Sequence, residues 1–273
     1  MISDTIKYIG VDDLDIDLFE SQYVVPEGMS YNSYLIDDEK IAVLDTADRR
    51  KGEEWKANLQ AALNGRQPDY LVAHHMEPDH AALIAWMLET YPGLQLVCSA
   101  AAVKMLPNFF EGFNFEGRVI TVKEGDTLSL GQHTLQFITA PMVHWPEVIM
   151  SYDTLDKVVF SADGFGKFGA LVNETDDWAC EARRYYFNIC GKYGIQVQNV
   201  LKKAERPKSA SIPFSPVSRT SQWSLILRSA FPRNSRSPIP FSPVKSRNRT
   251  ERGTSSSRSV PSHQKVSATT RPI

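Results

Sequence analysis

The sequence contains little that would brace the chain covalently or anchor it in a membrane. Among 273 residues there are three cysteines, Cys98, Cys180 and Cys190, which form no CxxC pair and no even-numbered framework. This usage is typical of reduced thiols and excludes a disulfide-stapled secreted domain. No segment approaches the ~20 consecutive apolar residues of a membrane span, and residues 1–5 hold no basic region that leads into an apolar stretch. We therefore expect a soluble, cytoplasmic protein.

Charge and composition divide the chain into two parts. The net charge is −2, but residues 1–205 alone carry −14, whereas residues 206–273 hold 13 basic side chains and one acidic side chain. The same 68 residues contain 17 serines and 9 of the 16 prolines, and they repeat one motif almost unchanged at 212–219 and 239–247. Such a composition buries too little apolar surface to offset the entropy of ordering. We therefore predict a folded body, 1–205, and a largely disordered basic tail, 206–273.

The body alternates between strand-like and helix-like patterns. Strands are expected at residues 31–36, 41–45, 70–73, 94–99, 119–122, 128–130, 133–140, 147–152 and 157–161. Helices are expected at residues 53–63, 81–91, 179–193 and 196–204. Strand-rich stretches interleaved with amphipathic helices fit stacked sheets flanked by helices, which is an α/β or α+β fold.

A dense group of metal-ligand residue types follows the predicted strand 70–73. Three of the six histidines lie in segment 74–80, which also supplies Glu77 and Asp79. Alternate positions of an extended loop face the same way, so His75, Glu77 and Asp79 are expected to converge on one centre. The absence of cysteine argues against a structural zinc site, and mixed imidazole and carboxylate donors favour iron or manganese, with zinc as the alternative. The competing interpretation is a polar helix cap with hydrogen-bonded histidines.

Two further candidates lie downstream. His144 follows the predicted strand 133–140 in the segment Met-Val-His-Trp-Pro, and Asp163 follows the strand 157–161 at a glycine-rich turn. An aspartate at the end of a strand is often a turn or cap residue. Beside the motif at 75–80, however, a carboxylate that bridges two metal ions is the favoured interpretation of Asp163.

The segment 75–80, followed by His144 and then by Asp163, resembles the order of motifs in the metallo-β-lactamase superfamily. Zinc hydrolases of that superfamily usually carry histidine where this chain has Glu77. Together with the segments at 30–35, 144–146 and 160–166, this glutamate makes residues 5–204 similar to the flavodiiron proteins, or A-type flavoproteins. The resemblance implies an αββα sandwich that holds two irons and reduces dioxygen to water or nitric oxide to nitrous oxide.

The resemblance also implies the ligands. His75, Glu77 and His144 would bind one iron and Asp79 the second, with Asp163 as the bridge between them.

Three other histidines have lesser expected roles. His80 would be a neighbour of the centre rather than a dependable ligand. His74 and His133 have no counterpart in the family's ligand set, and we expect them to be ordinary polar residues.

The resemblance also implies cofactors and partners, namely an FMN-binding domain, a rubredoxin-like electron donor and a head-to-tail homodimer.

The last part of the chain departs from the family. The family's last histidine ligand lies in a turn soon after the helix 196–204, whereas here the one later histidine is His263. The remaining 68 residues are too few for a flavin domain, which needs on the order of 100–150 residues. We therefore expect an oxidoreductase domain, truncated or read out of frame after residue 205 and impaired in activity.

Two alternatives from other classes stay open. A hydrolase of the same superfamily would use a metal-bound water to attack an ester or thioester, although Glu77 argues against it. A body without activity could instead carry a tail that binds nucleic acid through its basic residues. The tail lacks interleaved aromatic residues and a recognisable nucleic-acid-binding motif, so this alternative is not favoured.

Overall fold

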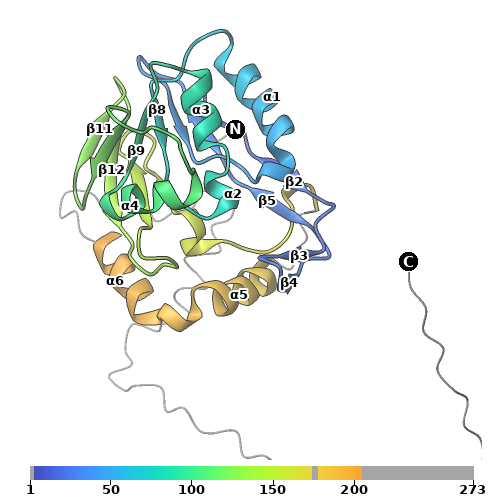
Figure 1. Cartoon of the computed structure of the whole chain (residues 1–273). Coiled ribbons are helices and arrows are strands. Elements are labelled where there is room, and N and C mark those ends of the chain that lie inside the picture. The colour runs from blue at the N-terminus through green and yellow to red at the C-terminus, as the bar shows by residue number, and fades with distance from the viewer. Residues whose placement is uncertain (1–2, 174–177, 205–273) are drawn as a thin grey trace, which may run out of the picture. The chain divides into compact units, whose positions relative to one another are not determined.

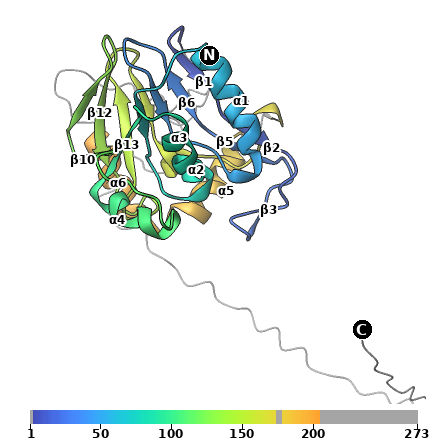
Figure 2. The same ribbon diagram turned by 45° about the horizontal axis from the view of Figure 1, so that its top comes forward.

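Two β-sheets packed face to face form the centre of the computed structural model, which describes residues 3–173 and 178–204 (Figures 1 and 2). The six-stranded sheet has the order β1 (Ile6–Tyr8), β6 (Tyr34–Ile36), β7 (Ala42–Leu44), β8 (Tyr70–Val72), β9 (Gln95–Ser99) and β10 (Val119–Val122). The four-stranded sheet has the order β11 (Thr127–Ser129), β12 (Thr134–Thr139), β13 (Ile149–Asp153) and β14 (Val158–Phe160). The strands from β7 to β10 run parallel to one another, and the other neighbours pair antiparallel.

Helices cover the outer faces of both sheets. The structure contains α1 (Gly52–Leu63), α2 (Pro78–Ala81), α3 (Ile84–Thr90), α4 (Ala100–Phe109), α5 (Trp178–Ile189) and α6 (Gly194–Ala204). Figure 1 shows α1 and α3 on one side of the sheets and α5 and α6 on the other. The described residues therefore form the αββα sandwich that the motifs predicted. None of the described helices is long and apolar enough to cross a membrane.

Two apolar cores follow from this layering. One lies between the sheets and joins Leu44 and Val97 of the first sheet to Phe137 and Phe160 of the second. The other gathers the side chains that point outward to the helices, such as Leu71. Because successive side chains of a strand point to opposite faces, one strand supplies both cores. This double burial explains why strands such as β7 read as continuous apolar runs.

Several predicted boundaries were wrong for identifiable reasons. The predicted strand 31–36 is two strands, because Tyr31 belongs to the two-stranded antiparallel sheet of β2 (Val11–Asp13) and β5 (Met29–Tyr31). Between β5 and β6, Ser33 is fully buried; its hydroxyl donates to the Asp45 carbonyl and its carbonyl accepts from the Ile9 amide. The chain thus ends its pairing with β2 at Tyr31 before β6 begins to pair with β1 and β7.

The predicted helix 81–91 begins earlier and is interrupted. Pro78 occupies the first turn of α2, a position that suits its fixed φ. The amide of Leu83 lies 3.3 Å from the Thr46 hydroxyl, where the chain passes from α2 to α3. The break places the histidine and carboxylates of segment 77–80 on their own short turn.

Helix α4 was missed entirely, as were β1 and the hairpin of β3 (Leu18–Phe19) and β4 (Tyr23–Val24). The N-cap of α4 is Ser99, whose hydroxyl accepts from the Ala102 amide at 3.1 Å and donates to the Glu147 carbonyl at 2.7 Å. A serine directly before an Ala-rich run was the available signal. The predicted tail, the domain boundary after residue 205 and His263 all lie outside the described residues.

Removing a side chain from the core between the sheets should destabilise the protein strongly. Phe137 has no exposed surface, so Phe137→Ala is expected to lower the free energy of unfolding by about 3–5 kcal/mol. Phe187 is 68% exposed, and Phe187→Ala should cost less than about 0.5 kcal/mol. Urea unfolding followed by circular dichroism measures both, and similar losses in the two variants would contradict this layering.

Candidate metal centre

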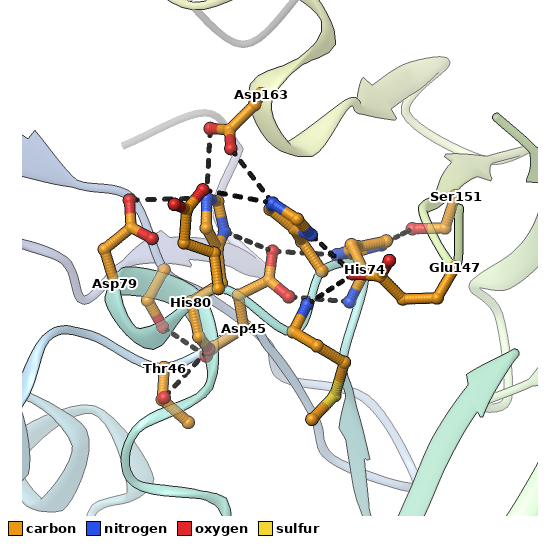
Figure 3. A network of polar contacts seen from close by, with 12 residues as sticks. Asp45, Thr46, His74, Asp79, His80, Glu147, Ser151 and Asp163 are labelled. Carbon is orange, nitrogen blue, oxygen red and sulfur yellow. Dashed lines mark hydrogen bonds and ion pairs between the residues drawn. The ribbon is translucent and has the colours of Figure 1, made fainter. Parts of the chain in front are cut away.

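The candidate ligands follow three strands, or lie on a short helix, and meet at one edge of the sandwich. His75 follows β8, His144 follows β12, Asp163 follows β14, and Asp79 with His80 lies on the short helix α2. The β strands fix these positions, and the loops after them present the side chains. Sequence positions as far apart as 79 and 163 are thereby brought together (Figure 3).

A first group of ligand atoms faces a common point. One atom each of His75, Glu77, His144 and Asp163 lies within 4.8 Å of all the others. The Nε2 atoms of His75 and His144 are 3.3 Å apart, and Glu77 Oε2 lies 3.3 Å and 3.1 Å from them. Asp163 Oδ2 completes the group at 3.4 Å from each imidazole. Two imidazoles and two carboxylates therefore surround one small volume.

A second group lies on the other side of the Asp163 carboxylate. His80 Nε2 is 3.0 Å from Asp163 Oδ1 and 3.7 Å from Asp79 Oδ2. The other carboxylate oxygen of Asp79, Oδ1, is buried and has no hydrogen-bond partner among the described residues. Asp163 thus directs one oxygen to each group, as a carboxylate between two metal ions does.

Glu147 holds the first group in place and was not among the predicted site residues. Its Oε1 lies 2.7 Å from His75 Nδ1 and accepts from the Met76 amide at 2.9 Å. The glutamate is fully buried and lies on the loop before β13, although residue 147 was expected to begin a strand. A proton on His75 Nδ1 that donates to Glu147 leaves Nε2 free to bind a metal ion. Its place three residues after His144 was the available signal.

Asp45 holds His80 of the second group in place and also contacts His74 (Figure 3). Its Oδ2 lies 3.3 Å from His80 Nδ1 and 3.0 Å from His74 Nδ1, while its Oδ1 accepts from the His74 amide. His74 Nε2 is in turn 2.7 Å from the Ser151 hydroxyl. The backbone of Asp45 is left-handed, with φ of 56°, a conformation that a non-glycine residue keeps only where its surroundings hold it.

The remaining histidines occupy defined buried positions. His74 and His133 are each 1% exposed. His133 Nδ1 lies 3.1 Å from Asp153 Oδ1, and its Nε2 lies 2.9 Å from the Thr5 hydroxyl. The expectation of ordinary polar residues understated their burial and their hydrogen bonding. Both brace the sandwich.

The pKa values of His75, His144 and Asp79 are all raised, so that protons on these side chains balance the negative charge of the carboxylates. Burial disfavours charged imidazoles, but bonds to Glu147 and Glu77 outweigh it and raise the pKa of His75 to about 9. Asp163 and Glu77 likewise raise the pKa of His144 to about 10 against the effect of burial. Burial first, and then the charges of Asp163 and Glu77, raise the pKa of Asp79 to about 7. Protons thus take the place that metal cations fill in a carboxylate-rich site.

The donor set fits two metal ions of intermediate hardness. Imidazole and carboxylate ligands without cysteine suit iron or manganese, with zinc as a further candidate. The two imidazole nitrogens that face one another at 3.3 Å and the Asp79 oxygen without a hydrogen-bond partner among the described residues are donor atoms that a cation could bind. Trp145 stands at right angles to the His75 ring at 5.1 Å between centroids and limits access from that side.

Comparisons with known proteins identify the family of this domain. The model of the ODP family beta lactamase matches residues 29–190. An anaerobic nitric oxide reductase flavorubredoxin from Vibrio vulnificus is 34% identical over 206 residues, which cover 72% of this chain and 41% of the relative.

Two solved structures share the fold. The flavodiiron protein from Giardia intestinalis has a TM-score of 0.67 at 30% identity, with 72% of this chain and 49% of that chain covered. Rubredoxin oxygen:oxidoreductase from Desulfovibrio gigas has a TM-score of 0.69 at 29% identity, with 74% and 51% covered.

The match has a defined extent. This chain covers between 33% and 42% of the length of the curated relatives and about half of the two solved chains. The part matched by the family model contains the strands from β5 to β14 and every candidate ligand. The chain therefore belongs to the ODP family of β-lactamase domains, and its relatives are flavodiiron proteins, as its motifs predicted.

Proposed function

We propose that this domain holds two iron ions and serves the reduction of dioxygen or nitric oxide. His75, Glu77 and His144 bind the first ion, Asp79 and His80 bind the second, and Asp163 bridges them. The observation that carries the proposal is the Asp163 carboxylate, whose Oδ2 faces the first group at 3.4 Å and whose Oδ1 faces the second at 3.0 Å. His80 was predicted to be a neighbour of the centre, but its Nε2 is directed at Asp163, which favours His80 as a ligand.

The chain's own residues orient the ligands and hold the charges. Two bound ferrous ions would supply electron transfer to a diatomic molecule. Glu147 and Asp45 fix the rings of His75 and His80 so that their Nε2 atoms face the centre. The Tyr185 hydroxyl donates to Asp163 Oδ1 at 2.8 Å, which keeps the proposed bridge in one orientation.

The names of the relatives support both substrates. The flavorubredoxin from Vibrio vulnificus is a nitric oxide reductase, and the enzyme from Desulfovibrio gigas is an oxygen oxidoreductase. We propose that the electrons come from a rubredoxin-type donor, which both names contain, and that a flavin group relays them. Turnover of dioxygen against nitric oxide with a chemical reductant would distinguish the substrates.

Metal stoichiometry tests the centre directly. Protein purified without oxygen is expected to contain close to two irons per chain, and Asp163→Ala should lose both because each ion loses its shared ligand. The exposed Asp17 supplies the control, since Asp17→Ala removes a carboxylate that belongs to neither group of candidate ligands. Elemental analysis with Mössbauer spectroscopy gives the count and the coupling. A single tightly held zinc with ester turnover would instead establish the hydrolase alternative.

The Glu147 contact should set metal affinity without itself touching the ion. Glu147→Gln keeps the shape but removes the charge behind His75, so the dissociation constant for Fe²⁺ is expected to rise about tenfold. Glu116→Gln is the matched control at an exposed position. Competition against a chelator measures both, and equal affinities would show that Glu147 is only a structural residue.

Metal binding should release protons. His75 and His144, with pKa values of about 9 and 10, carry protons at pH 7 in the metal-free chain. At least one must leave when an ion binds, so affinity should increase as the pH rises from about 6 to 9, because fewer protons then compete. Calorimetry in buffers of different ionisation enthalpy measures the release; a heat that is the same in all buffers would contradict it.

A further inference from the structure

A second cluster of ligand side chains lies at the other end of the four-stranded sheet. One ligand atom each of His133, Asp153 and Asp156 lies within 4.8 Å of the other two. His133 directly precedes β12, whereas His144 of the candidate metal centre follows the same strand. The six residues of β12 span about 20 Å. This cluster is therefore separate from the candidate metal centre.

Two neighbouring turns of the sheet bring the cluster together. His133 ends the turn between β11 and β12, and Asp153 is the last residue of β13. Asp156 lies in the turn that leads to β14, and its main-chain amide donates to Asp153 Oδ2 at 2.8 Å. The turns thus present one imidazole and two carboxylates to one another.

The imidazole of this cluster is held in a fixed orientation. His133 is buried, its Nε2 lies 2.9 Å from the Thr5 hydroxyl, and its main-chain amide donates to Asp38 Oδ2 at 2.6 Å. A proton on Nε2 that donates to Thr5 leaves Nδ1 free to bind a cation. Nδ1 is also the atom that faces the carboxylates, at 3.1 Å from Asp153 Oδ1.

The negative charge of the cluster is not balanced by lysine or arginine in the part of the chain that the structure describes. Asp153 is fully buried, and there its one ion-pair partner is His133. A buried carboxylate is stable only where a hydrogen bond or a cation compensates for the lost water. A hydrogen-bonded pair of His133 and Asp153 gives no role to the carboxylate of Asp156, whereas a divalent cation would serve all three side chains at once.

The donor set limits the kind of cation. One imidazole and two carboxylates suit zinc, manganese or iron better than calcium, which takes oxygen ligands alone. Three protein ligands leave coordination positions for water. Because Asp156 is exposed, we expect the cluster to exchange its cation with solvent and to lose it during purification. It therefore adds nothing to the iron count expected for the candidate metal centre.

We propose that His133, Asp153 and Asp156 form a binding site for a divalent transition-metal cation. The cation would clamp the two sheets together at the end remote from the candidate metal centre. Thr5, which holds the His133 ring, directly precedes β1, and Asp38, which holds its main chain, lies between β6 and β7. Both belong to the six-stranded sheet, whereas the ligands belong to the four-stranded sheet. The site does not depend on the function proposed above.

Equilibrium dialysis of the full chain against Zn²⁺ tests the proposal. Asp156→Asn keeps the main-chain amide that bonds to Asp153 but removes the charge of one ligand. Over the range of free Zn²⁺ in which the unaltered chain takes up its last zinc, this variant should hold about one zinc fewer per chain. Asp17→Asn, at an exposed position outside the clusters, should match the unaltered chain. Equal zinc contents in the variants and the unaltered chain would overturn the proposal.

Nitrogen-15 NMR of the histidine rings identifies the atom that binds. Zn²⁺ should shift the Nδ1 resonance of His133 while Nε2 keeps its proton, because Thr5 holds that atom. The order is reversed at the candidate metal centre, where Glu147 holds Nδ1 of His75, so the two sites give different signals. A His133 ring that Zn²⁺ leaves unchanged, while the His75 ring responds, would overturn the proposed site.

Discussion

Buried carboxylates at the end of the sandwich govern the rest of the structure. Asp45 and Asp163 are 5% and 7% exposed, and Glu147 is 1% exposed. An ionised carboxylate without compensation costs several kcal/mol in such surroundings, so each must face a proton, a hydrogen-bond donor or a cation. The four histidines of segments 74–80 and 144 supply that compensation. The fold and the chemistry of its site therefore cannot be separated.

The sandwich explains how so many polar groups can be gathered without disrupting the apolar cores. The polar residues sit in loops beyond the strands, whereas the strands themselves are apolar on both faces, as in β7 and β14. Asp45 directly follows β7, and Asp163 follows β14 across two residues. The apolar cores therefore stop at the ends of the strands, and the loops beyond them carry the ligands. His75 comes from the first sheet, whereas His144 and Asp163 come from the second.

The sequence predicted the main parts of the fold because the signals were local. The helix 53–63 had helical spacing of its apolar residues, the strands 94–99 and 119–122 were short and rich in apolar residues, and the motif at 75–80 placed several ligands close together along the chain. The pairing of β1 with β6 could not be predicted, because three-residue strands carry too little periodicity and their partner is distant in sequence. The same reason hides Tyr185, whose contact with Asp163 depends on how α5 packs.

The hydroxyl of Ser99 ties a helix to the candidate metal centre. It caps α4 through the Ala102 amide and also donates to the carbonyl of Glu147, whose side chain bonds to His75. The start of α4 and the orientation of His75 are therefore mechanically coupled through one residue. An ion that fixes His75 would also restrict the opening of α4. Metal binding would therefore slow local unfolding at the start of this helix, which contributes no ligand to the centre.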